Sequence, residues 1–268
     1  GPPRYNHDPE TLTPTGLYLE PEATNHIHHS NHFHNPNNWN YNGGSVAIDN
    51  TIAAPTGETG VAVFTEDTTL GVHHLNASAS TQRDILLSSG SNTVSLFVKP
   101  LSTRNIIHLR INAIGTNSPS IDFKLDDQTV HYRAGTSNTT SQNVSWTANA
   151  YVEKYQNDWY RLVLNYDFGT ANKSPNLTIN TFESDDITNI PNPFQGNGQK
   201  TMAFFGLQNE AGSYASSYID TTGSTVTRNP DIFTSTATTV LDRDGGNKEA
   251  FFTPTSGNSS FVIGSNQL

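Results

Sequence analysis

Histidines gather in one short stretch near the start of the chain. Five of the ten histidines lie between His26 and His34. Two pairs have the spacing His-x-His, and on a β-strand side chains two residues apart project from the same face. We therefore expect His26, His28, His32 and His34 to be candidate ligands of a transition metal, because imidazole nitrogens bind such ions well. Around a threefold axis, one His-x-His pair from each of three chains would supply six nitrogens. The alternative is a polar edge strand whose histidines are solvated.

A second candidate site is the polar face of three successive strands. Alternation of apolar and polar residues predicts these strands near residues 105–112, 121–125 and 130–132. If they pair in sequence order, the faces that point away from the core bring together His108, Arg110, Asp122, Lys124, His131 and Arg133. Such a face could bind an acidic or hydroxyl-rich glycan, since a guanidinium forms paired hydrogen bonds with a carboxylate. The alternative is an ordinary solvated sheet face of mixed charge.

Tryptophans are candidates for stacking on sugar rings. Trp39 and Trp146 lie in stretches rich in Asn and Ser, and we include both in the expected glycan site. Trp combines a large apolar face with one hydrogen-bond donor, which suits recognition sites. Core packing is the alternative, and it is the preferred interpretation for Trp159, which lies in an alternating strand.

Motifs for catalysis are scarce in the sequence. The pairs Asp126-Asp127 and Asp185-Asp186 could serve glycoside hydrolysis, but both fall in predicted turns, where Asp is favoured for local reasons. The chain has no Gly-Lys-Ser/Thr phosphate loop, no Gly-x-Ser-x-Gly elbow and no His-Glu-x-x-His helix motif. We therefore predict a protein that is not an enzyme and requires no cofactor. A structural calcium ion is a further expectation, and its available oxygen ligands are Asp220, Asp231, Asp242 and Asp244.

Composition narrows the class of protein. Only 33% of the 268 residues are hydrophobic, 14% are charged, the formal net charge is −10, and Cys is absent. No apolar run has the length of a membrane-spanning helix, and the acidity argues against nucleic acid as a partner. Asn, Ser and Thr make up about a third of the chain, but 13 Phe, 10 Tyr and 3 Trp are too many aromatic residues for a disordered segment.

The pattern of short alternating segments predicts an all-β fold. Residues 158–166 alternate cleanly, and Gln156-Asn157 before them reads as the turn of a hairpin. Strands recur at this spacing with almost no helical periodicity, so we expect an antiparallel β-sandwich of the jelly-roll type. The expected domain organisation is an extended N-terminal connector (1–15), the sandwich (16–231), and a C-terminal extension or linker with short docking strands (232–268).

Several sequence motifs resemble a β-sandwich domain common in bacteriophage structural proteins. They follow the order found in that family across nearly all of residues 4–231. The entry segment Gly16 to Asn25 is similar to the family's GLLVE-x-x-x-TN run, and it follows a run, Arg4 to Pro9, that is similar to R(F/Y)DHDP. Asn157 to Arg161 resembles its GNGWYR strand. The segments Gly206 to Tyr214, Ser217 to Ile219 and Thr225 to Arg228 resemble its closing GAQLEAGSFPTSYIPT…VTR signature.

This resemblance implies a fold and a setting. The family's domains are jelly rolls akin to carbohydrate-binding modules and concanavalin-like sandwiches, and they occur in tail fibres and other virion appendages. It therefore implies a non-catalytic adhesion protein on the virion surface. The expected partners are other virion proteins and a cell-surface or extracellular glycan, and the expected oligomer is a trimer. The alternatives are a carbohydrate-binding module of a secreted bacterial polysaccharide-degrading enzyme and a glycan depolymerase. The sequence departs from the family at residues 25–34, where the family has a more apolar strand.

Overall fold

The structure is a computed structural model, and it describes most of the chain. The described residues are 4–77, 90–112, 120–132, 149–167, 176–182, 187 and 193–231, followed by four short strands at 233–235, 238–240, 251–253 and 259–261. Within them the chain is almost entirely β-structure. The prediction of an all-β antiparallel fold is confirmed.

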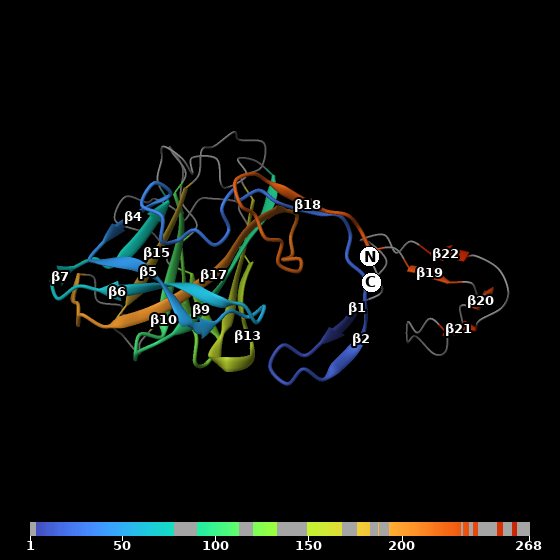
Figure 1. Ribbon diagram of the computed structural model, residues 1–268, viewed down its shortest axis with the longest axis horizontal. Helices are drawn as coiled ribbons and strands as arrows, with labels where there is room; N and C mark the ends of the chain where they lie inside the picture. The colour runs from blue at the N-terminus through green and yellow to red at the C-terminus, as the bar shows by residue number, and fades with distance from the viewer. Residues whose placement is uncertain are drawn as a thin grey trace. The chain divides into compact units, whose positions relative to one another are not determined.

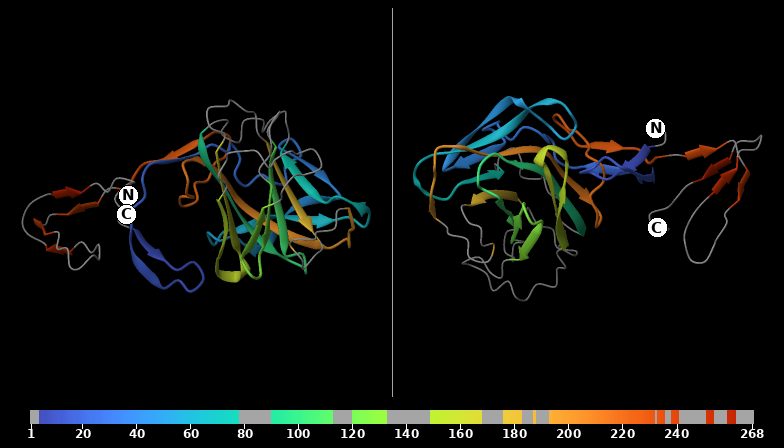
Figure 2. Two further views of the ribbon diagram at one scale, coloured as in Figure 1. Left: turned by 180° about the vertical axis from the view of Figure 1, so that it is seen from behind. Right: turned by 90° about the horizontal axis from the view of Figure 1, so that it is seen from below.

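Two six-stranded antiparallel sheets form the two layers of a sandwich (Figure 1; Figure 2). We name each sheet by its edge strands. The β12–β4 sheet contains, in spatial order, β12 (Thr129–Tyr132), β11 (Ser120–Lys124), β10 (Ile106–Asn112), β15 (Asn176–Phe182), β8 (His74–Ala77) and β4 (Trp39–Asn42). The β13–β5 sheet contains β13 (Asn149–Lys154), β14 (Tyr160–Asp167), β9 (Ser91–Pro100), β17 (Lys200–Ala211), β6 (Thr59–Glu66) and β5 (Gly44–Ala53).

The main core lies between these sheets, and each strand contributes every second residue to it. From the β12–β4 sheet come Leu109, Phe123 and Ile179, and from the β13–β5 sheet come Leu96 and Leu162, all with essentially no exposed surface. Fully burying an aliphatic or aromatic side chain of this size contributes about 1.5–3 kcal/mol, so the shared core dominates the stability of the sandwich.

The hairpin predicted around residue 157 is present. β13 and β14 pair from Asn149↔Asn165 to Lys154↔Tyr160. Between them Asn157 has φ 57°, a left-handed conformation that Asn tolerates better than most residues. The side chain of Trp159, just after the turn, is buried and donates from Nε1 to the Ala53 carbonyl at 2.9 Å, which confirms its expected role in packing.

The outer face of the β13–β5 sheet is also covered. A second apolar cluster there includes Val63, Phe97, Trp159 and Phe205, with Tyr218 packed against it. All ten residues from Thr201 to Glu210 in β17 are buried, as expected for a strand covered on both faces.

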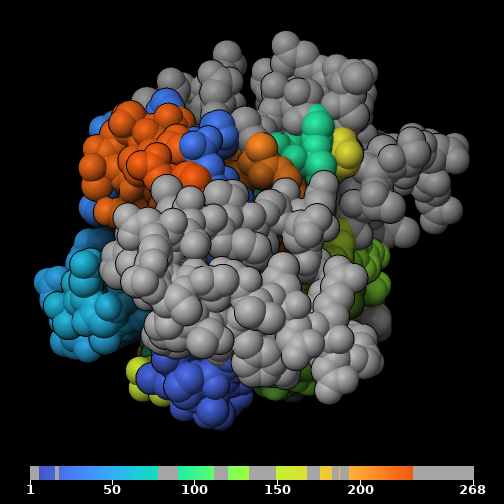
Figure 3. Space-filling model, turned by 90° about the vertical axis from the view of Figure 1, so that its right-hand side faces the viewer, coloured from blue at the N-terminus to red at the C-terminus, as the bar shows by residue number. Residues whose placement is uncertain are grey.

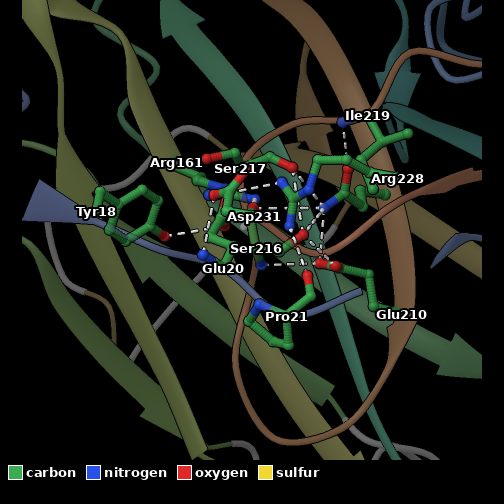
Figure 4. Close-up of polar contacts among 11 residues, drawn as sticks. Tyr18, Glu20, Pro21, Arg161, Glu210, Ser216, Ser217, Ile219, Arg228 and Asp231 are labelled. Carbon is green, nitrogen blue, oxygen red and sulfur yellow. Dashed lines mark hydrogen bonds and ion pairs between the residues drawn. The ribbon is translucent and has the colours of Figure 1, made fainter. Parts of the chain in front are cut away.

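The segment that follows β17 is fixed to this sheet by buried polar groups (Figure 4). The Glu210 carboxylate accepts hydrogen bonds from the Ser216 hydroxyl, from the Ser216 backbone N–H at 3.0 Å and from Gln208 Nε2 at 2.6 Å. Gln208 Oε1 in turn accepts from the Ile219 N–H at 2.7 Å, and Arg161 Nη2 donates to the Ser216 carbonyl at 2.6 Å. The motif residues of the closing segment therefore have a structural role.

Short strand pairs accompany the two sheets. β7 (Leu70–Gly71) pairs with β16 (Phe194–Gln195), and β3 (Ala23–Asn25) pairs with β18 (Val226–Arg228). In Figure 3 the orange segment leading to β18 lies against blue residues of the segment near β3. Near this pairing, the hydroxyls of Thr24 and Thr227 are 2.8 Å apart.

The two ends of the chain belong to a second compact unit, residues 1–23 with 228–268, and residues 24–227 form the first. β1 (Arg4–His7) and β2 (Pro14–Tyr18) form a hairpin where we expected an extended connector. The reason is a turn in which Asp8 Oδ1 accepts from the Thr11 N–H at 2.7 Å.

Glu20 forms an ion pair with Arg228 at 2.7 Å and its N–H donates to Asp231 at 3.0 Å (Figure 4). The remaining strands pair as β19 (Phe233–Ser235) with β22 (Ser259–Phe261) and β20 (Thr238–Val240) with β21 (Phe251–Thr253).

We predict that Glu210→Ala destabilises the sandwich by about 2 kcal/mol or more, because buried donors of Ser216 and Gln208 lose their acceptor. The measurement is the free energy of unfolding in denaturant. Glu58→Ala, at an exposed position, is the control and should change it by less than about 0.5 kcal/mol. Equal stability of the two variants would contradict the structural role of this network.

Candidate functional site

Hydrogen-bonding side chains run in two rows across the outer face of the β12–β4 sheet. Residues paired directly across antiparallel strands share a face, so the strand register defines the rows. The first row is His131, Asp122, His108, Asn180, His74 and Asn42, and it crosses all six strands. The second row is Ser120, Arg110, Thr178, Asn76 and Asn40, and it crosses five.

The sequence predicted four of the eleven residues in these two rows, all of them on three of the six strands. The strands β10, β11 and β12 pair in sequence order, as expected, and the register places His108 opposite Asp122 and Asp122 opposite His131. Lys124 lies two residues after Asp122 on β11 and is paired with Ile106, so it belongs to neither row. Its ammonium contacts Asp127 at 3.1 Å. Arg133 and Trp146 lie outside the described residues. The contributions of β15, β8 and β4 were missed, since their outward Asn, Thr and His residues resemble loop composition.

The middle of the first row is a buried network rather than an exposed surface. His108 is 3% exposed and Asp122 is 0% exposed, so the expectation that both face solvent is wrong. His108 Nδ1 is 2.8 Å from Asp122 Oδ1, and His131 Nδ1 is 3.4 Å from Asp122 Oδ2. Ser120 Oγ lies 3.1 Å from His108 Nε2. Burial of a carboxylate is tolerated here because two imidazoles and a hydroxyl form one hydrogen-bonded chain with it.

A small apolar cluster lies on the same outer face at the Ile106 end of the sheet. Ile106 and Phe182 are paired across β10 and β15, and both pack with Phe194. The Phe182 ring also stands edge-on to His108, with centroids 6.0 Å apart. Beside it, the Arg104 guanidinium lies 4.9 Å from the Phe194 ring centroid and forms a buried ion pair with Glu66 at 2.9 Å. This end of the face is therefore closed by packing.

The accessible part of the face lies on β15, β8 and β4. Asn40 and Asn42 are exposed, and His74, Asn76 and Thr178 are partly exposed. Thr178 Oγ1 donates to Asn76 Oδ1 at 3.0 Å. This bond uses the amide oxygen of Asn76 and leaves its two N–H donors for other acceptors. Burial, followed by the neighbouring His73, lowers the pKa of His74 and so favours the neutral imidazole. Amides, a hydroxyl and a neutral imidazole can all bond to hydroxyl groups of a ligand.

Arg110 stands at the boundary between the buried network and the accessible part. It is partly exposed, and its buried Nε has no hydrogen-bond partner in the structure. A guanidinium without a paired carboxylate inside a polar face can receive an anionic ligand group.

Trp39 does not contribute to this face. The ring is 1% exposed and belongs to the main core, stacked on Phe33 at a centroid distance of 5.3 Å. Alternation along β4 explains the placement, because Trp39 and Tyr41 point inward while Asn40 and Asn42 point outward. The expectation that Trp39 stacks on a sugar is therefore wrong in this structure.

The histidine-rich segment is not a strand. Asn25 Oδ1 accepts from the Ile27 N–H at 3.0 Å, and this local turn ends β3 before the first histidine. Instead of sharing one strand face, the rings of His29 and His32 stack at 4.7 Å and His34 lies edge-on to His32 at 5.8 Å. His26 is partly exposed and His28 is exposed. The same-face arrangement on which the metal hypothesis was based is therefore wrong.

The described residues of one chain contain no group of three or more His, Asp or Glu side chains arranged to hold a metal ion. The shared metal on a threefold axis requires three copies of the chain and stays a prediction. Of the expected calcium ligands, Asp220 accepts from the Tyr218 hydroxyl at 2.8 Å and Asp231 from the Glu20 N–H at 3.0 Å, whereas Asp242 and Asp244 lie outside the described residues.

Comparisons with known proteins supply no family. No family model matches the sequence, and no curated protein matches it. Among solved structures, the chain is similar to an exo-β-agarase at 9% identity and a TM-score of 0.32, over 61% of this chain and 25% of that one. It is also similar to a putative sugar binding protein from Bacteroides thetaiotaomicron at 8% identity and a TM-score of 0.32, over 70% of this chain and 95% of that one. The chain thus spans a quarter of the agarase, and likenesses of this size carry no argument about function. No helix among the described residues has the length and apolar character of a membrane span.

We predict that His74 makes the stability depend on pH. Because its pKa is lower in the folded state than the ordinary value of 6.5, the unfolded chain binds more protons below pH 6.5. The contribution of His74 to the free energy of unfolding therefore falls as the pH drops. Between about pH 7.5 and pH 5.5, the melting temperature of the wild type should fall further than that of His74→Asn. Parallel decreases in both proteins would contradict the lowered pKa.

The shared metal can be tested by elemental analysis of the purified oligomer. One transition-metal ion for every three chains, lost in His26→Asn/His28→Asn, is the result expected from the metal hypothesis. A fully assembled oligomer without metal would overturn it.

Proposed function

We propose that the protein is a non-catalytic glycan-binding β-sandwich whose binding surface is the outer face of the β12–β4 sheet. The observation that carries this proposal is the pair of side-chain rows that cross five and six strands of that sheet. The accessible stretch runs from Arg110 on β10 to Asn40 on β4. With neighbouring strands about 4.8 Å apart, its three intervals make a length of roughly 14 Å, enough to contact consecutive sugar rings.

The other sheet is a poor candidate for the same role. Much of its outer face is covered by the apolar cluster around Phe97 and Phe205 and by the Glu210 network. The β12–β4 sheet instead offers exposed or partly exposed amides at Asn40, Asn42 and Asn76. Strand-borne groups of this kind are held rigidly by the sheet, which reduces the entropy lost on binding.

A specific observation favours a second candidate function, hydrolysis. Ser120, His108 and Asp122 follow the order of nucleophile, base and orienting acid, at 3.1 and 2.8 Å. However, Ser120 is only 4% exposed, and Asp122 is shared with a second imidazole, that of His131. We therefore assign this chain of residues to holding β10, β11 and β12 in register. Release of sugar or acyl product by the wild type, abolished in Ser120→Ala, would establish the hydrolase instead.

The setting of the module is a separate proposal. The polar face supports a sugar-binding module, whatever larger protein carries it. We propose first that the carrier is a secreted polysaccharide-degrading enzyme. An appendage on a phage virion is supported only by the sequence motifs of the entry, central and closing segments. Mass spectrometry of purified virions from the source would support the virion if it detects the chain. A monomeric chain that binds soluble polysaccharide and is absent from particles would support the enzyme-borne module.

We predict that Asn76→Ala weakens glycan binding without affecting the fold. The loss of one amide that bonds to ligand hydroxyls should cost about 1 kcal/mol, which is roughly a fivefold increase in Kd. The measurement is calorimetry with the tightest-binding polysaccharide from a glycan array. Asn50→Ala, at an exposed position on β5 of the other sheet, is the matched control and should bind like the wild type. Equal affinities of the two variants would contradict the assignment of the face.

A further inference from the structure

We propose that the glycan bound by this face is acidic and that a sugar carboxylate binds the guanidinium of Arg110. This inference rests on the proposed function and adds the chemical class of the ligand. It follows from the state of Arg110 in the structure, from its neighbours in the second row, and from the charge of the whole chain.

Arg110 is the second of the five residues in the second row. Its strand partners are Ser120 on β11 and Thr178 on β15, both with hydroxyl side chains. No ion pair with a carboxylate is formed by Arg110 within the described residues, and Nε is buried without an acceptor. A guanidinium has five N–H donors in a fixed fork and accepts no hydrogen bonds, so neutral hydroxyl neighbours cannot balance its charge.

The other arginines with described side chains each have hydrogen-bond partners, although Nε of Arg161 and Nε of Arg228 are also buried without an acceptor. Arg104 forms two-point contacts with Glu66, and Arg228 pairs with Glu20. Arg161 donates to the Ser216 carbonyl and to Ser95 Oγ at 3.0 Å. Arg110 differs from these in lying on an accessible face and lacking a partner.

The carboxylate closest to Arg110 in the strand register is already committed. Asp122 lies in the neighbouring row, where Oδ1 pairs with His108 and Oδ2 with His131. Both oxygens of Asp122 thus have imidazole partners, and the guanidinium of Arg110 is left for an external anion. A carboxylate is the anion that fits best, since its two oxygens match the fork of the guanidinium.

The net charge of −10 makes a local cation necessary for an acidic ligand. An acidic chain repels polyanions at long range, so an acidic glycan cannot be held by a general basic surface. Binding must therefore depend on one short-range contact, together with hydrogen bonds from the neighbouring amides and hydroxyls. Substitution of Arg110 should then abolish the preference for acidic glycans.

The test compares acidic polysaccharides with their carboxyl-reduced forms, in which each carboxylate has become a primary alcohol. The probes are alginate, polygalacturonate and hyaluronate, measured by calorimetry at about 0.15 M salt. We expect at least one native polymer to bind about tenfold or more tightly than its reduced form, and Arg110→Gln to remove that difference. Arg110→Lys keeps the charge but loses the fork, so it should restore only part of the difference.

The matched control is Lys200→Gln, which removes one positive charge at an exposed ion pair with Asp49 on the other sheet. It should bind the acidic polymer like the wild type. Circular dichroism and thermal unfolding should show that Arg110→Gln is folded and at least as stable as the wild type, because an unpaired cation has been removed.

The outcomes separate this inference from the proposed function. Equal binding of native and reduced polymers, or an undiminished preference in Arg110→Gln, would overturn the inference while glycan binding itself stands. Binding of neutral glycans alone on the array would do the same. Absence of binding to every glycan on the array would overturn both.

Discussion

Burial of one face of each six-stranded sheet against the other is the constraint on which the rest of the structure depends. Because a strand alternates its side chains, placing Leu109, Phe123 and Ile179 in the shared core forces their neighbours to the outer face. On the β13–β5 sheet, the outer residues are covered by a second apolar cluster and by the closing segment. On the β12–β4 sheet, the same alternation produces the polar rows. The candidate site is thus a direct consequence of how the core is built.

Much of this arrangement could be predicted from the sequence, since alternation is a local property. The strands around Leu109, Phe123 and Val163, the turn at Asn157, and the pairing of β10, β11 and β12 follow from patterns within a few residues. The predicted face was incomplete because Asn40, Asn42 and Asn76 belong to short strands whose composition resembles that of loops. Their role becomes visible only when β4 and β8 pair beside β15.

Other features depended on contacts between distant segments and could not be read from spacing. The burial of His108 and Asp122 depends on what packs above the sheet, and alternation determines only the side to which a residue points. In the histidine-rich segment, the Asn25 side chain ends the strand, which moved the histidines off the expected common face. The closing motif could be recognised by resemblance, but its function became clear only from the bonds between Glu210 and Ser216.

Charge compensation distinguishes structural from functional polar groups in this molecule. Glu66 with Arg104, Glu210 with its donors and Asp122 with two histidines are all buried and paired. Among the arginines with described side chains, Arg110 has neither an ion pair nor a side-chain hydrogen bond, and it lies where the rows become accessible. Because Arg110 is partly exposed and has no acceptor in the described part of the chain, its guanidinium is available to a ligand on the polar face.

The central claim is that the outer face of the β12–β4 sheet binds glycan. The most direct test is nuclear magnetic resonance of labelled protein during titration with the tightest-binding oligosaccharide. The account predicts that shift changes concentrate on residues of β10, β15, β8 and β4, with Arg110, Asn76 and Asn40 among the largest. Changes confined to β5 and β6 of the other sheet, or to the ends of the chain, would contradict it.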